Sequence, residues 1–354
     1  MSHLKQPHHG GEIDEHAGGG AEAGRRLRHG LISLAILVAI VVGLLLAVPG
    51  LHQVAQTVAR MNGWWIAAGI GFEILSCLGY VLAFLQVFDR APIRFGARVA
   101  LSELAFNAAV SLGGAGSVAV GGWLLVERGA PVARVAERSA VLFLVTSAIN
   151  VITFILAGLG LFTGALDGPH GALLTLLPAA VGTAGFAFFL ALPALIERRG
   201  LQRVPRRLRV VLETTAESIR DTWQMLRRPD WRIVGAIAYL WCDIAVLVVC
   251  LAAAHHVPPI GAIVLAYQIA YISNMLPVPG GIGVLDGSMV GMLVVYGARA
   301  STAAAATVVY HAISLWVPAM WGTIAFIVLR RTGREPLHLR PPRAERRRLR
   351  KAAG

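Results

Sequence analysis

The feature that most constrains this chain is a series of long stretches without a charged residue. Several are longer than the about 20 residues that a helix needs to cross a bilayer. Only 14% of the residues are charged and 56% are apolar, whereas a soluble domain has about 25% charged residues. We therefore predict an all-α, polytopic helical membrane protein. The uncharged stretches are 30–59, 61–72, 74–88, 104–126, 139–166, 168–196, 244–285 and 300–329.

The basic residues predict the topology, because Lys and Arg gather on the cytoplasmic side of membrane proteins. If residues 99–125 crossed the bilayer once, the arginine-rich loop 197–231 would lie outside. If they instead enter and leave at one face, all 32 Lys and Arg except Arg60 and Arg299 lie on the cytoplasmic side. Each arm is then about 12 residues long, too short to cross alone. The sequence thus predicts a re-entrant helical hairpin here.

A second hairpin is predicted at 260–296, where two prolines and three glycines interrupt an apolar segment. It must return to the outer face so that the last span delivers the basic tail to the cytoplasm. We expect about six full spans plus these two re-entrant hairpins, with both termini cytoplasmic and the protein in the cell (inner) membrane. The expected spans lie near 30–49, 63–88, 135–163, 171–193, 232–254 and 302–329.

The two hairpins resemble each other at an offset of 167 residues. Asn107 aligns with Asn274, Gly113-Gly114 with Gly280-Gly281, and Gly116 with Gly283. Because they enter from opposite faces, they predict an inverted repeat of the kind found in transporters. The expected organisation is a disordered cytoplasmic leader (1–29), a transmembrane domain (30–329) with repeat 1 at about 63–163, the loop 197–231 and repeat 2 at about 232–329, and a basic cytoplasmic tail (330–354).

Ionisable groups inside apolar segments are costly and are candidates for function. Four carboxylates remain there, and His311 is a side chain that titrates near neutral pH. The alternative role for the carboxylates and His311 is a structural hydrogen bond to a neighbouring helix. For the three arginines named below, the alternative is the ordinary excess of positive charge on the cytoplasmic side. The substrate-binding candidates are Asp286, Glu73, Asp243, Glu103, His311, Asn107, Asn274, Gly113, Gly114, Gly116, Pro277, Pro279, Gly280, Gly281 and Gly283, and the headgroup or phosphate candidates are Arg128, Arg134 and Arg138.

The motifs of several enzyme classes do not occur in the sequence. It has no Walker A, H-E-x-x-H or G-x-S-x-G pattern, and its three cysteines lack the spacing of a zinc or redox site. We expect no catalytic residue, no metal, no cofactor and no enzymatic activity. The basic residues flank the spans throughout, which favours anionic headgroups over nucleic acid as their partner. A lipid is the expected substrate, and a homo-oligomer is possible.

The run from Pro277 to Asp286, with Gly297-Ala298 and the span through Tyr310-His311, resembles the flippase-like transmembrane region of the lysylphosphatidylglycerol synthase family. Gly113-Gly114 and Arg128-Gly129-Ala130-Pro131 resemble the first-half equivalent. The resemblance covers about residues 30–330 and implies lipid translocation, without the soluble aminoacyl-transferase domain. Members of the family often have Glu in place of Asp286 and Arg in place of His311 and roughly Val145.

The function expected from these observations is a lipid transporter or flippase that moves a phospholipid or other lipid-linked headgroup between leaflets by alternating access. Two alternatives stay open. One is a secondary transporter of a small solute or ion, and the other is a non-transporting membrane partner of a lipid or cell-envelope synthesis complex.

A reporter-fusion map tests the topology. Fusions within 126–134 and within the tail 330–354 should report the cytoplasm, and fusions at 297–299 the outside, because the first hairpin returns to its own face. A reporter at 126–134 that reads outside would overturn the hairpin.

Overall fold

The computed structural model describes residues 49–89, 91–109, 115–199, 216, 219–220, 233–274 and 282–332. The leader, nearly all of the predicted first span, the tail and both hairpin turns fall outside these ranges. So do most of the loop 197–231 and the side chains of Asn274 and Asp286. From Thr57 onward the chain forms one compact unit.

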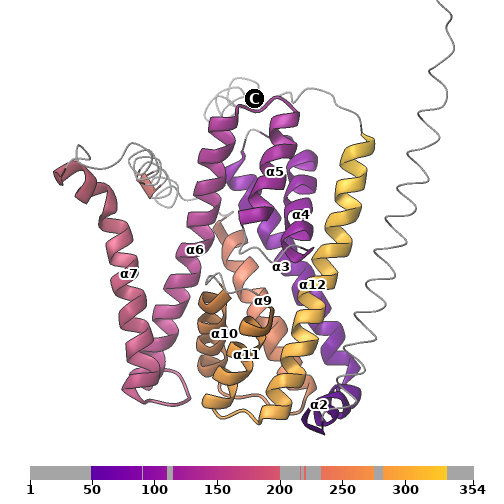
Figure 1. The fold of residues 1–354 in the computed structure, drawn as a ribbon, viewed down its shortest axis with the longest axis vertical. Helices are drawn as coiled ribbons and strands as arrows, with labels where there is room; N and C mark the ends of the chain where they lie inside the picture. The colour runs from indigo at the N-terminus through magenta and orange to yellow at the C-terminus, as the bar shows by residue number, and fades with distance from the viewer. Residues whose placement is uncertain are drawn as a thin grey trace, which may run out of the picture. The chain divides into compact units, whose positions relative to one another are not determined.

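The described residues form helices and no strand, which confirms the predicted class. Five helices (α3, α6, α7, α9 and α12) contain a segment long and apolar enough to cross a membrane. These helices expose large apolar side chains such as Leu156, Leu173 and Phe188, as expected of surfaces that face lipid. The helices, shown in Figure 1, are α2 (Pro49–Ala59), α3 (Gly63–Val87), α4 (Ile93–Ala109), α5 (Ala115–Glu127), α6 (Val132–Phe162), α7 (Ala172–Arg199), α9 (Ile233–Ala253), α10 (Ile260–Asn274), α11 (Ile282–Val295) and α12 (Ala300–Arg331).

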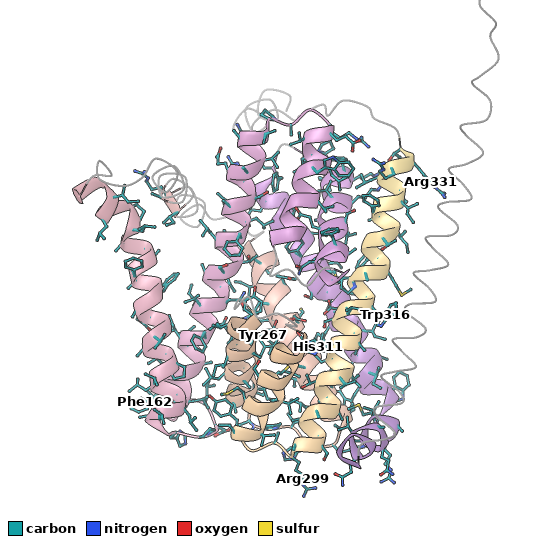
Figure 2. All side chains as sticks on the ribbon, in the orientation of Figure 1. Phe162, Tyr267, Arg299, His311, Trp316 and Arg331 are labelled. Carbon is teal, nitrogen blue, oxygen red and sulfur yellow. The ribbon has the colours of Figure 1, made fainter. Side chains whose placement is uncertain are left out.

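The two predicted hairpins are the helix pairs α4–α5 and α10–α11, and they occupy opposite ends of the bundle (Figure 1). Arg330 forms an ion pair with Glu127 at 3.5 Å, which puts the exit of the first hairpin beside the end of α12. The Tyr296 hydroxyl, at the exit of the second hairpin, donates to the Leu174 carbonyl oxygen at 2.9 Å near the start of α7. Arg331 and Arg299 mark these two ends in Figure 2.

The bounds of the hairpin arms repeat at the predicted offset. α4 and α10 each begin directly after a proline, Pro92 and Pro259, whose carbonyl accepts the first helical hydrogen bond. α5 and α11 also begin 167 residues apart. The first hairpin is longer than predicted, because α4 begins near Pro92 rather than at residue 99, and its first turn follows the helix start that the proline favours.

Both hairpins end in the same capping motif. Gly129 and Gly297 have φ angles of +89° and +100°, a backbone conformation that glycine adopts readily. In the first motif the N–H of Gly129 donates to Val126 and that of Ala130 to Leu125, and the second motif repeats this pattern. This is the paired hydrogen bonding of a Schellman motif, and it turns each hairpin into the span that follows.

The packing of the helices is also mirrored. α3 and α9, which precede the two hairpins, pack against each other most extensively, and each hairpin's first arm packs against the last span of the other repeat, as α4–α12 and α10–α6. A Cβ added to Gly79 of α3 would lie 2.6 Å from the backbone nitrogen of Tyr239 in α9. The two backbones are therefore in direct contact, which only small residues permit.

Each hairpin has its own hydrophobic core. One core combines α3, α4 and α5 with the first half of α6 and the last residues of α12, including Ala325 and Leu329. The other combines α9, α10 and α11 with the second half of α6 and the first half of α12, up to Ile313. The two longest helices, α6 and α12, thus belong to both cores. Pro318 lies between the α12 residues of one core and the α12 residues of the other.

Gly79→Ala is expected to destabilise the protein by about 1–3 kcal/mol, because the new methyl group meets the α9 backbone. Gly71→Ala, on the same helix, is the matched control because a Cβ there meets no atom within 4 Å. Both changes alter helix propensity equally. The difference between their melting temperatures in detergent therefore measures the destabilisation caused by a methyl group at the contact between α3 and α9. Equal melting temperatures would contradict it.

Candidate functional site

A polar cluster lies where α3 and α9 cross in the middle of the bundle. Glu73 of α3 is 5% exposed, and its carboxyl interacts directly with that of Asp243 from α9. The sequence predicted both residues as candidates from their places in the two repeats. The structure brings them together as one pair, with one carboxyl from each repeat.

Two tyrosines hold Asp243 from the other side. The hydroxyls of Tyr267 on α10 and Tyr310 on α12 both donate to Asp243 Oδ2, the second at 2.9 Å. The rings of these tyrosines meet edge to face with their centroids 6.3 Å apart. Four helices therefore converge on the carboxyl pair, one from repeat 1 and three from repeat 2.

His311 also belongs to this cluster. Its ring lies 4.9 Å from that of Tyr310, centroid to centroid, and its charge acts on Asp243. Figure 2 places His311 and Tyr267 near mid-height in the bundle, between Arg331 at one end and Arg299 at the other. The structure therefore groups three of the predicted candidates, Glu73, Asp243 and His311.

Glu73 is poorly satisfied for a carboxyl in this position. The Cys77 thiol, a weak donor, is 3.9 Å from Oε1. Oε2 is buried and receives no hydrogen bond from the residues that the structure describes. Buried polar atoms in proteins are generally hydrogen-bonded, so this oxygen marks a place where a further donor belongs.

Glu103, the third predicted carboxylate, lies in a separate place and ties the first hairpin to α3. It is 3% exposed, and its Oε2 accepts a hydrogen bond from the Tyr80 hydroxyl at 2.9 Å. Its carboxyl lies directly over Gly121 of α5, since a Cβ there would be 1.7 Å from Oε1. The Glu103 side chain thus contacts two neighbouring helices of the first repeat, α3 and α5.

Each repeat has a hydrogen bond between a tyrosine and a carboxylate that joins a span to a hairpin, but the donor and the acceptor change places between the two repeats. In repeat 1 the tyrosine is on the span (Tyr80) and the carboxylate on the hairpin (Glu103), whereas in repeat 2 the carboxylate is on the span (Asp243) and the tyrosine on the hairpin (Tyr267). The Tyr80 ring is 5.2 Å from that of Tyr239 on α9, centroid to centroid. A series of tyrosines therefore extends from Glu103 towards the central pair.

These tyrosines were not among the predicted site residues. A signal was present, since the chain has only six tyrosines and all of them lie in or beside the apolar helices. A tyrosine buried in an apolar helix needs a partner for its hydroxyl. Three of the six tyrosines donate to one of two intramembrane carboxylates, Glu103 and Asp243, and sequence position alone does not reveal these pairs.

The remaining candidates separate into described and undescribed residues. Asn107 of α4 is exposed and is not part of the cluster. Gly116 and Gly283 lie in the first turns of α5 and α11 rather than in the hairpin turns. The other candidates lie outside the described residues or have side chains outside them, and they stay predictions: Gly113, Gly114, Asn274, Pro277, Pro279, Gly280, Gly281 and Asp286.

The three predicted headgroup arginines differ in their contacts. Arg128 donates to the Leu329 carbonyl oxygen at 3.2 Å and lies over the Phe95 ring, 5.3 Å from its centroid, so it fastens the first hairpin to α12. Arg134 is exposed, and Arg138 is 3.9 Å from Glu137. These two arginines line a small, mainly apolar pocket between the ends of α3 and α5 and the start of α6.

Comparison with known proteins identifies the family. The transmembrane region of the lysylphosphatidylglycerol synthase family matches residues 30–322, a range that includes repeat 1 and all of repeat 2 except its last residues. The chain belongs to this family. A search among curated proteins gives no match. Family membership identifies a multi-pass membrane protein involved in lipid handling, and the central cluster lies within the matched region.

Arg128 and Arg134 are expected to respond differently to substitution. Arg128→Ala should lower the free energy of unfolding by about 1 kcal/mol, because it removes a hydrogen bond and a cation–π contact. Arg134→Ala should keep the melting temperature in detergent but lose part of the stabilisation that added phosphatidylglycerol provides. Equal loss of stability in both variants would contradict these roles.

Proposed function

We propose that this protein is a flippase, a transporter that moves a phospholipid or another lipid-linked headgroup between the two leaflets by alternating access. The observation that carries the proposal is the pair of hairpins inserted from opposite ends of the bundle, with mirrored packing around α3 and α9. Paired broken segments in inverted repeats are typical of transporters, in which one repeat rocks against the other around a central site.

The polar cluster supports a transport role because of its place. Carboxyl groups at the centre of an apolar bundle are costly and usually mark a substrate or ion pathway. Glu73, Asp243 and His311 lie where helices of both repeats meet, so a change in the packing of the repeats changes their surroundings. Asp286, the fifth residue of α11, is the further residue that we propose to bind the headgroup.

Family membership favours a lipid over a small solute or ion as the substrate. The exposed apolar side chains of the long helices offer a surface along which acyl chains can stay in the bilayer while a headgroup crosses. A role as a non-transporting partner of a synthesis complex would leave the buried carboxyl cluster without a use. We propose transport rather than enzymatic activity.

The charge distribution supports an orientation. The arginines at the ends of α5 and α12 and at the start of α6 lie at one end of the bundle. We propose that the protein lies in the cell (inner) membrane and that this end faces the cytoplasm. Both termini are then cytoplasmic. The loop 197–231 and the tail 330–354 would lie against anionic headgroups, and a homo-oligomer is compatible with this arrangement.

A vesicle assay tests the proposal. Purified protein in liposomes should accelerate the transfer of fluorescent phosphatidylglycerol between leaflets, measured by the fraction protected from a membrane-impermeant quencher. Gly281→Leu and Asp286→Asn should reduce the rate to that of protein-free vesicles, because they alter the second hairpin break and the residue beside it.

Gly71→Leu is the matched control, since this position on α3 meets no atom within 4 Å, and it should keep the wild-type rate. Uptake of a polar solute without lipid transfer would favour the solute or ion transporter. Wild-type protein that moves no lipid, across several headgroups, would refute the proposal.

A further inference from the structure

The central cluster contains two acceptors that face each other with no donor between them. Glu73 Oε2 is buried, receives no hydrogen bond within the described part of the chain, and its carboxyl interacts directly with that of Asp243. An ionised carboxylate only accepts hydrogen bonds, whereas a protonated one also donates. The atom that would complete this contact is therefore a proton.

We infer that the Glu73–Asp243 pair is a proton-binding site that couples lipid movement to the proton gradient, with one proton taken up on one side of the membrane and released on the other in each cycle. This inference rests on the proposed function and adds its energy source. No bond of the lipid is made or broken, and the transmembrane gradient supplies and removes the proton.

The groups around the pair are those of a proton-binding site and not those of a salt bridge. The titratable groups that act on it are Cys77 of α3, Tyr239 and Cys242 of α9, Tyr267 and Tyr271 of α10, and Tyr310 and His311 of α12. Of these, only His311 can carry a positive charge. Two like charges in a site of low dielectric repel each other strongly, so a shared proton relieves this repulsion.

The position of the pair explains how a proton would move helices. With the proton bound, Glu73 of repeat 1 and Asp243 of repeat 2 are joined by a hydrogen bond. Without it, the two carboxylates repel, while the hydroxyls of Tyr267 and Tyr310 still donate to Asp243. Release of the proton therefore weakens a contact between the repeats and leaves the contacts within repeat 2 in place.

Glu103 provides an internal comparison. It is buried to the same degree as Glu73, but it receives a hydrogen bond from Tyr80 and no second carboxyl acts on it. A structural carboxyl in this bundle is thus satisfied by a tyrosine within its own repeat. The Glu73–Asp243 pair differs because it spans the two repeats and leaves one oxygen without a donor.

The first measurement does not depend on lipid transport. Infrared spectra of the purified wild-type protein, recorded across a pH series, should contain the carbonyl band of a protonated carboxyl group that disappears at high pH. The band should lose intensity in the double variant Glu73→Gln/Asp243→Asn, which keeps the buried carboxyl of Glu103, and it should be unchanged in Glu127→Gln, which removes a carboxylate at the basic end of the bundle. A band that is unchanged in the double variant would overturn the proton site.

The second measurement uses liposomes with fluorescent phosphatidylglycerol and an imposed pH gradient of one unit. With one proton per lipid, wild-type protein should build a ratio between leaflets of up to about tenfold, and an ionophore that collapses the gradient should abolish it. Glu73→Gln and Asp243→Asn should give a ratio of one whatever their rate of lipid transfer, whereas Glu127→Gln should behave as wild type.

The outcomes separate the two proposals. Lipid transfer by the wild type that ignores the pH gradient, or an equal ratio in Glu73→Gln, would overturn the coupling and leave the flippase standing. Absence of any lipid transfer would refute the flippase and with it the coupling, and the infrared band would then decide whether the pair binds a proton.

Discussion

The direct contact between α3 and α9 is the interaction on which the rest of the site depends. Gly79 and Gly235 let the two backbones meet, and the Ser76 hydroxyl donates to the Tyr239 carbonyl oxygen at 2.8 Å across the same crossing. A larger separation of the two helices would weaken the interaction between the carboxyls of Glu73 and Asp243. The hairpins and last spans then pack around this pair of helices in a mirrored arrangement.

Much of this fold was predictable because it follows from charge and backbone chemistry. The arginines flanking 99–125 permit only a segment that returns to its own face, and the structure has the hairpin α4–α5 there. Helix breakers at matching places predicted the second hairpin and the inverted repeat. The predicted start of α4 lies too late in the chain, because the helix begins after Pro92 rather than at the start of the apolar stretch.

The site was predictable only in part. Burial of a carboxylate in an apolar segment singled out Glu73, Asp243 and Glu103, but it did not say which of them meet. Tyr80 and Glu103 are 23 residues apart and Tyr310 and Asp243 are 67 apart, so their pairing depends on how the helices cross. The same limit applies to Arg128, which the sequence could not distinguish from Arg134 because its partner is a backbone carbonyl of α12.

The division of α12 between two hydrophobic cores has a mechanical consequence. Its first half carries Tyr310 and packs with the second hairpin, while its end is fastened to the first hairpin through Leu329 and Arg330. Pro318, between them, has no N–H for the Ser314 carbonyl, so the helix is least stiff where it passes from one core to the other. The two halves of α12 can therefore tilt with separate hairpins while the chain stays continuous.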